Sequence, residues 1–378
     1  MVKLGSDALE DLSAGAVFLA TGGGGDPYVA KLIAEQALER YGPVNLVAPE
    51  ELADDAYVVA IGGVGAPTVS LELLPSVNDA LATLQAFEER VGRKVDAVVS
   101  FEIGGGNSLI PIVAAAAAGL PVVDGDGMGR ALPEAQMMTY PITGVLPTPA
   151  VVTDYKGEVT EFHTKDILTF EKEIRQCAMV SGGMITSAEH PMTGRQLKDS
   201  VIPGTVSFSI KLGRQLRQNR GNAHRIFEPL AALFSESIYG NLFHLFTGKV
   251  IDSSTKVIGG FDIGQAHIAP FTGSAEPLTI NIKNEYLVAT QGERLLASVP
   301  DLITVVDYET STPINAERLR FGQRVTVLGV GCPAFYRTQR ALQYVAPRCF
   351  GFPFDYQPIE SLTSPDPPDR TTPIRAGI

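Results

Sequence analysis

The chain has 378 residues, 45% of them hydrophobic and 19% charged, which is typical of a globular protein and suggests two domains. Its formal net charge of -12 at pH 7 argues against a nucleic-acid binder, because such proteins need basic patches to neutralise phosphates. No apolar run approaches the roughly 18 residues of a membrane helix, and the first residues lack a secretory signal pattern. We therefore expect a cytoplasmic protein without a membrane or nucleic-acid partner, and we expect its three cysteines to be free thiols.

Residues 1–165 are predicted to form an α/β domain with a mainly parallel, helix-covered sheet. Apolar runs typical of strands lie at 14–20, 56–63, 94–103 and 120–127, and helical patterns lie between them at 27–42, 76–91 and 109–118. Strands that are apolar on both faces and alternate with helices indicate a parallel sheet between helical layers. Two further strands are expected near 140–147 and 150–154.

Residues 166–355 predict a second domain that is rich in β-structure, an antiparallel sandwich or barrel. Short alternating runs at 246–271, 277–290, 301–310 and 323–330 are broken by glycine and other turn residues. A helical pattern near 204–240 indicates a helical insertion in this domain. The polar, proline-rich residues 356–378 are expected to be an extended or disordered tail.

Each of the four predicted strands of the first domain ends in a glycine-rich turn, at 22–25, 62–65, 104–106 or 125–129. The carboxyl ends of parallel strands share one edge of a sheet, which is where ligands bind in open α/β folds. Glycine lets backbone N–H groups approach a ligand, so this edge is the expected site; the alternative is ordinary turn geometry. Standard phosphate-binding and dinucleotide motifs are missing, which makes nucleotide binding a weak hypothesis.

Five acidic or amide positions carry most of the chemical signal. Glu102 follows the buried run VVSF, where a desolvated carboxylate has a raised pKa and can act as a general base; the alternative is a structural pair with arginine or backbone amides. Asp124 and Asp126 would share one face of an extended segment, where they could bind a metal, orient water or accept from turn amides. Asn284 and Glu285 interrupt the run 277–290, so one of them is expected to face inward unless this run is a solvent-facing edge.

These signals define two groups of candidate residues. The candidate catalytic residues are Glu102, Asp126 and Asn107. The candidate substrate-binding residues are Thr21, Gly23, Gly24, Asp26, Gly105, Gly106, Asp124, Arg130, Glu134, Asn284 and Glu285. The histidines are scattered without metal-ligand spacing, so no metal ligand and no cofactor are predicted, although a divalent metal held by distant residues stays open. Cys332 is open between a nucleophile and a buried free thiol.

Five segments together resemble the S-methyl thiohydantoin desulfurase family: TGGGGDP, EIGGGNS, DGDGMGRALPEAQM, INIKNEYLVA and PDLITVVDYETSTPINAERLRFGQRVTVLG. The resemblance covers most of the chain, and DGDGMGRALPEAQ is its most specific motif. It implies hydrolysis at C2 of an S-methyl thiohydantoin, in which water attacks an amidine-like carbon, methanethiol leaves and a hydantoin remains. The family's association with hydantoin metabolism implies a small-molecule substrate and a possible hydantoinase-type partner.

The candidate residues suggest roles in such a reaction. Glu102 or Asp126 would be the base for water, Asn107 and loop N–H groups would donate hydrogen bonds, and Arg130 would bind a substrate carboxylate. Two other functions stay open: a nucleotide- or cofactor-binding α/β enzyme of other chemistry, and a non-catalytic accessory subunit of a hydantoinase-like complex. We also expect the protein to be a homo-oligomer.

Overall fold

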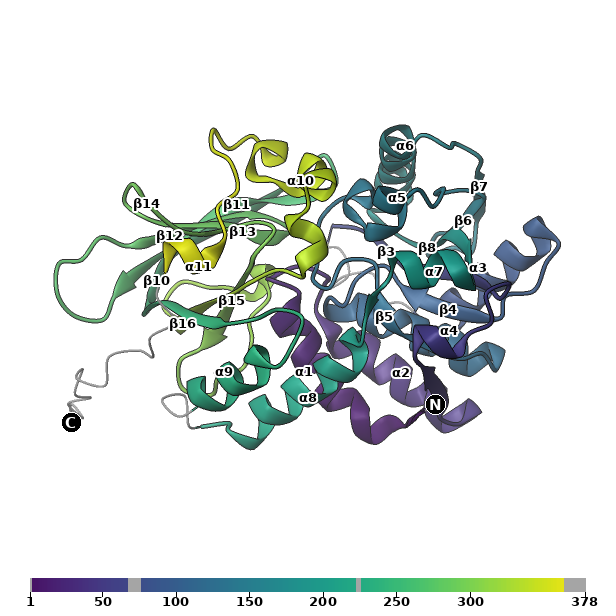
Figure 1. The fold of residues 1–378 in the computed structure, drawn as a ribbon, viewed down its shortest axis with the longest axis horizontal. Coiled ribbons are helices and arrows are strands. Elements are labelled where there is room, and N and C mark those ends of the chain that lie inside the picture. The colour runs from purple at the N-terminus through teal and green to yellow at the C-terminus, as the bar shows by residue number, and fades with distance from the viewer. Residues whose placement is uncertain (1, 67–75, 222–225, 364–378) are drawn as a thin grey trace.

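The computed structural model describes residues 2–66, 76–221 and 226–363, which form two β-sheets with their helices, side by side (Figure 1). Helices cover the first sheet, and the second sheet curls as a half-barrel. This arrangement confirms the predicted fold class, an α/β part followed by a β-rich part with a helical insertion. Within the described ranges, no helix is long and apolar enough to cross a membrane.

The first sheet has nine strands and a parallel centre. Its order is β1-β2-β5-β4-β3-β8-β6-β7, with β9 paired to β5, and the pairs β2–β5, β5–β4 and β4–β3 are parallel. The other pairs in this sheet are antiparallel. The strands are β1 (Val2–Leu4), β2 (Val44–Val47), β3 (Tyr57–Gly65), β4 (Ala97–Ser100), β5 (Val122–Asp126), β6 (Ala150–Thr153), β7 (Val159–Phe162), β8 (Met184–Thr193) and β9 (Ile202–Pro203).

Local sequence signals at several helix ends explain where the helix begins or ends. Asp26 caps α2 by accepting from the Tyr28 N–H, and Pro27 occupies the first helical position. Gly92 and Gly119 end α3 and α4 in the left-handed conformation that favours glycine. The helices are α1 (Leu9–Leu19), α2 (Pro27–Tyr41), α3 (Val77–Val91), α4 (Ile110–Ala118), α5 (Thr139–Thr143), α6 (Ile167–Val180), α7 (Gly194–Ser200), α8 (Thr205–Gln218), α9 (Phe227–Ser235), α10 (Gln339–Val345) and α11 (Ile359–Leu362).

The second sheet has seven strands, all antiparallel, in the order β14-β13-β12-β11-β10-β16-β15. Alternate side chains of its strands form a separate hydrophobic core. The strands are β10 (Leu242–Ile258), β11 (Phe261–Pro270), β12 (Leu278–Lys283), β13 (Glu285–Gln291), β14 (Arg294–Ser298), β15 (Leu302–Asp307) and β16 (Arg324–Val330).

The strand predicted at 14–20 is wrong, because this run is the end of helix α1. A short run of buried apolar residues has no periodicity that separates a strand from a buried helix. Helix α1 is buried because it packs closely on α8: a Cβ on Gly15 would lie 1.9 Å from the Ser209 carbonyl oxygen, and one on Gly213 would lie 1.7 Å from that of Asp11. The two glycines therefore permit backbone contact between helices at the junction of the two sheets (Figure 1).

Two other sequence-based expectations also differ from the structure. The run 140–147 is mostly helix α5 rather than a strand. The run 277–290 is a hairpin of β12 and β13 that folds back at Asn284, whose φ of +58° is in the left-handed region. Asparagine is tolerated there because of its short polar side chain. In addition, β8 and β9 lie beyond residue 165 and still belong to the first sheet, and α11 lies in the stretch expected to be an extended tail.

Candidate functional site

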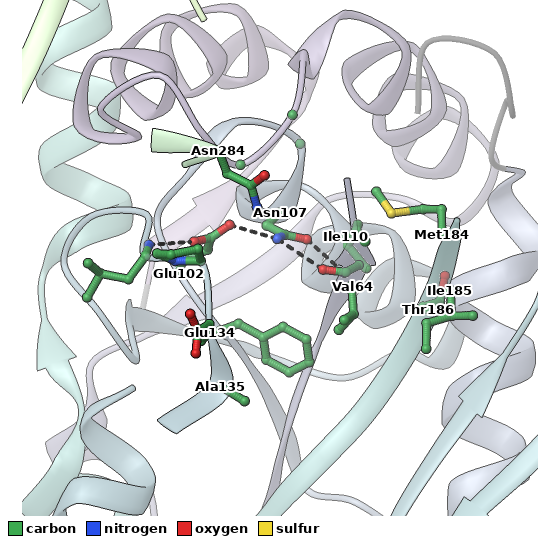
Figure 2. Close-up of a pocket in the computed structure, with 18 of the residues that line it drawn as sticks. Val64, Glu102, Asn107, Ile110, Glu134, Ala135, Met184, Ile185, Thr186 and Asn284 are labelled. Atoms are coloured by element: carbon green, nitrogen blue, oxygen red, sulfur yellow. Dashed lines mark hydrogen bonds between the residues drawn. The ribbon is translucent and has the colours of Figure 1, made fainter. Parts of the chain in front are cut away.

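A cavity of about 160 Å³ lies at the carboxyl ends of β3 and β4, beside residues 132–135 of the segment that follows β5, and the β12–β13 hairpin of the second sheet forms part of its wall (Figure 2). It is comparable to the roughly 150 Å³ cavity that holds a benzene molecule in an engineered protein. Glu102, Asn107 and Asn284 gather on one side, whereas Met184, Ile185 and Thr186 of β8 form the opposite wall. The cavity therefore has a polar side and a mainly apolar side, and its size suits one small ring.

Glu102 is on the loop that leaves β4, and its side chain is only 6% exposed. Its Oε1 accepts a hydrogen bond of 2.8 Å from Asn107 Nδ2, and its Oε2 accepts one of 3.3 Å from the Leu132 N–H. Burial raises the pKa of Glu102 to about 7, and these two donors and the Arg130 charge only partly oppose the rise. A carboxylate with such a pKa can take and release a proton at neutral pH.

Asn107 uses its side-chain amide to hold Glu102 in place. Its Oδ1 accepts from the Gly63 N–H at 2.7 Å, while Nδ2 donates to the Gly63 carbonyl at 3.3 Å and to Glu102 at 2.8 Å. The amide thus joins the ends of β3 and the β4 loop (Figure 2). Because both N–H bonds of Nδ2 are already directed at protein oxygens, Asn107 is better suited to positioning Glu102 than to donating to a substrate.

The glycines of the turns at 22–25 and 104–106 allow these two loops to pack against each other. The Gly106 N–H donates to the Gly24 carbonyl at 2.9 Å, and a Cβ on Gly105 would lie 2.0 Å from the Gly25 carbonyl oxygen. Gly24 has a φ of +69°, and a Cβ there would lie 2.5 Å from the Gly104 carbonyl carbon. These glycines let two backbones meet in the wall of the cavity, so their close packing does not require a bound phosphate.

The hairpin of the second sheet brings two polar residues to the same side of the cavity. Asn284 is 5% exposed, and its Oδ1 accepts from the Asp262 N–H at 2.8 Å, which leaves Nδ2 without a partner among the described residues. Glu285 is 2% exposed, and its Oε2 also has no hydrogen-bond partner in the described part of the chain. Both residues line the cavity, although they are adjacent in sequence, because the chain turns sharply at Asn284.

Several charged residues that line the cavity form ion pairs. Glu134 pairs with Lys283 of the hairpin, and Glu171 pairs with Arg175 on α6, with a distance of 2.8 Å between Oε1 and Nη2. Asp26 caps α2 and pairs with Arg318, with 2.7 Å between Oδ2 and Nε. These pairs connect neighbouring elements and neutralise three of the acidic side chains that line the cavity. In contrast, neither Glu102 nor Glu285 forms an ion pair with a cationic side chain among the described residues.

Several predicted site residues lie behind the cavity wall instead of lining it. The Oδ2 of Asp126 accepts from the N–H groups of Ile103, Met128 and Gly129 at 2.9, 2.9 and 2.7 Å, and burial raises its pKa to about 7. Asp124 accepts from the Ser207 N–H at 3.0 Å, in the first turn of α8. These contacts hold loops and a helix in place. Of the other predicted residues, Gly24, Asp26, Gly106 and Glu134 line the cavity, and Gly23 and Gly105 do not.

Arg130 is completely buried and joins the two halves of the protein. Its Nη1 donates to the carbonyl oxygens of Pro300 and Asp301 at 2.7 and 2.8 Å, and its Nη2 donates to Thr21 Oγ1 at 2.7 Å. Thr21 itself has an unusual φ of +51°. Neither residue lines the cavity, so the guanidinium is directed at protein oxygens and not at a site for a substrate carboxylate.

Sequence reasoning missed the wall that β8 and α6 provide. Glu189 on β8 is 1% exposed, lines the cavity and accepts from Ser187 Oγ at 2.5 Å. A glutamate and a histidine in the middle of the run MITSAEHPMT were a possible signal, as were Glu171 and Arg175 at i and i+4. The second pattern is common on exposed helices, so it carried little information.

Neither a metal centre nor a reactive thiol is evident at this site. In the ranges that the structure describes, no group of three or more histidine, cysteine, aspartate or glutamate residues is arranged to hold a metal ion. Cys332 is 3% exposed and does not line the cavity, and burial raises the pKa of its thiol to about 12. A thiol in this environment is a poor nucleophile.

Comparisons with known proteins identify the family. A crystal structure of a protein from Chromobacterium violaceum has a TM-score of 0.81 and 26% sequence identity to this chain, with 95% of this chain and 100% of that chain covered. No functionally curated protein matches the chain at a significant level. The family described as "S-Me-THD-like, N-terminal domain" matches residues 7–164, and the one described as "S-Me-THD-like, C-terminal domain" matches residues 165–359. With both domains matched in order over nearly its whole length, the chain belongs to the S-Me-THD-like family.

Proposed function

We propose that this protein is a hydrolase of small cyclic ureide-like compounds, which hydrolyses an S-methyl thiohydantoin to a hydantoin and releases methanethiol. The observation that carries the proposal is Glu102, a buried carboxylate with a pKa of about 7 in the wall of a cavity that suits one small ring. Membership in the S-Me-THD-like family supports the choice of ring.

The reaction needs a base at the carbon that carries sulfur. Glu102 in its ionised form takes a proton from water as the water oxygen bonds to C2 of the ring. Asn107 holds the carboxylate with its Oε1 in a fixed direction, which reduces the cost of orienting the base. Asp126 is less suited to this role, because it lies outside the cavity wall and three backbone N–H groups already donate to one of its oxygens.

The remaining wall suits the other parts of such a substrate. Asn284 offers Nδ2 as a hydrogen-bond donor to a ring carbonyl oxygen, a contact that strengthens if negative charge develops on the ring. Val64, Ile110, Met184 and Ile185 provide an apolar surface for the S-methyl group and for an apolar substituent on the ring (Figure 2). A substrate carboxylate is not favoured, because the charged residues that line the cavity are acidic except for Arg175, which is paired with Glu171.

The test is turnover by the isolated protein. A panel of S-methyl thiohydantoins with different ring substituents is incubated with the protein in water enriched in heavy oxygen. We expect a free thiol, detected with a thiol reagent, and a hydantoin that carries one heavy oxygen at C2, detected by mass spectrometry. The absence of thiol release over the whole panel by folded protein would contradict the proposal and would favour an accessory subunit, which co-purification with a hydantoinase-type partner would then test.

A further inference from the structure

The proposed reaction leaves one requirement without a residue. As water adds to C2, the electrons of the C2=N bond move to the ring nitrogen, which needs a proton. Asn107 was the candidate donor, but its Nδ2 donates to Glu102 and Gly63. Asn284 can donate a hydrogen bond, yet an amide does not transfer a proton at neutral pH. A protonated carboxyl group in the cavity, distinct from Glu102, would supply this proton.

We propose that Glu285, on the hairpin of the second sheet, is this acid and forms a catalytic pair with Glu102 of the first domain. This inference rests on the proposed function. Glu285 lines the same cavity as Glu102, is 2% exposed, and has an Oε2 without a hydrogen-bond partner among the described residues. A buried oxygen with no partner at a cavity wall is available to a ligand.

The packing of the glycine loops brings the two carboxyl groups together. Gly23 lies directly against Glu285, since a Cβ there would be 2.0 Å from Oε1. The neighbouring Gly24 packs on Gly104, and a Cβ on Gly104 would be 3.3 Å from the Glu102 carboxyl carbon. Glu285 thus packs against one of these two loops and Glu102 against the other, and a side chain at position 23 would clash with the Glu285 carboxyl group.

The electrostatic environment raises the pKa of both carboxyl groups. Burial first, and the Glu102 charge second, raise the pKa of Glu285 well above its ordinary value, whereas Arg130 and Lys283 oppose the rise. The pKa of Glu102 is raised only to about 7. Two nearby carboxyl groups that titrate at different pH values can serve as acid and base in one reaction. In the proposed pair Glu285 therefore holds the proton, and Glu102 accepts one.

The proton transfers balance with these two groups alone. In the first step Glu102 takes a proton from water, the C2–O bond forms, and the ring nitrogen takes the proton of Glu285. In the second step the new hydroxyl returns a proton to Glu285 as the C2=O bond forms. The C2–S bond breaks, and the sulfur leaves with the bonding electron pair and takes the proton from Glu102. The products are the hydantoin and methanethiol, no atom is oxidised or reduced, and both carboxyl groups regain their initial states.

The first experiment detects the proton on Glu285 without using turnover. We expect the infrared band of a protonated carboxylic acid at pH 7 in the difference between wild type and Glu285→Gln. We expect the same band in a difference spectrum between Glu102→Gln and the double variant. Because Glu102 raises the pKa of Glu285, this band should titrate at lower pH in Glu102→Gln. If Glu285→Gln does not fold, the titration is followed in Glu102→Gln against wild type. A Glu285 that is ionised at pH 7 in wild type would overturn the inference.

The second experiment separates this inference from the proposed function. Glu285→Gln should bind the hydantoin product but lose about 10²-fold or more in kcat, the usual range for loss of an acid. Glu317→Gln is the matched control, because burial also raises the pKa of this 6% exposed carboxyl to about 7, although it does not line the cavity. Its kcat should be that of wild type. Normal turnover by Glu285→Gln would overturn the role of Glu285 and leave the proposed function standing. A wild type without turnover would instead overturn the proposed function, whatever the infrared result.

Discussion

Replacing Glu102 by glutamine should lower the rate and, at high pH, stabilise the fold. The pKa of Glu102 is raised from 4.5 to about 7, chiefly because its charged form is buried. In the folded state it keeps its proton between about pH 4.5 and 7, where the unfolded chain loses it, so stability falls as pH rises through this window. This difference in pKa corresponds to about 3 kcal/mol above pH 7.

The glutamine variant does not titrate and so avoids this loss. Its amide Nε2–H would face the Leu132 N–H, which costs about 1–3 kcal/mol at every pH. The difference in unfolding free energy between variant and wild type should therefore shift in favour of the variant by about 3 kcal/mol between pH 4 and pH 8. Urea titrations at a series of pH values measure this shift, and the constant cost cancels from it.

The rate should respond in the opposite direction. For the wild type, kcat/KM should rise with pH and level off above about pH 7, since the ionised carboxylate is the active form. The variant should lose about 10²–10⁴-fold in kcat at pH 8. Glu317→Gln is again the control: it should gain stability at high pH for the same reason and keep its rate. A Glu102→Gln variant that is folded and turns over as fast as wild type would refute the role of Glu102 as base.

Three further substitutions test the surroundings of the site. Asn107→Ala removes a donor that lowers the pKa of Glu102, so the rising limb of the kcat/KM profile should move to higher pH; an unmoved limb would mean that Asn107 does not position the base. Arg130→Met leaves the buried acceptors on Thr21, Pro300 and Asp301 unpaired and should lower the free energy of unfolding in urea by about 1–3 kcal/mol for each acceptor. A much smaller loss would show that water or rearrangement replaces its contacts. Cys332→Ser should keep the wild-type kcat, because the thiol lies outside the cavity wall; inactivity of a folded variant would restore the nucleophile hypothesis.

The sequence by itself determined the class of the fold and the region of the cavity. Runs that are apolar on both faces and alternate with amphipathic helical patterns are typical of a sheet covered by helices, so β3, β4 and β5 and the helices α2 to α4 follow from the pattern. Glu102 next to such a run had to be buried or paired, and this followed from local sequence alone. The family resemblance was equally visible in the motifs, and the two matched domains bear it out.

Only the tertiary structure decided what each polar residue does. The run 14–20 gives no periodic signal that separates a strand from a helix, because it is apolar throughout. It belongs to the end of helix α1, which packs against α8. Asp126 and Arg130 are residue types that are common in catalytic sites, but their side chains form hydrogen bonds with backbone groups and with Thr21 from distant parts of the chain. Conversely, Glu285 reaches the cavity because a hairpin folds at Asn284. The sequence gives the chemical type of each side chain. Whether that side chain is hydrogen-bonded or free depends on long-range contacts, which a local sequence pattern does not contain.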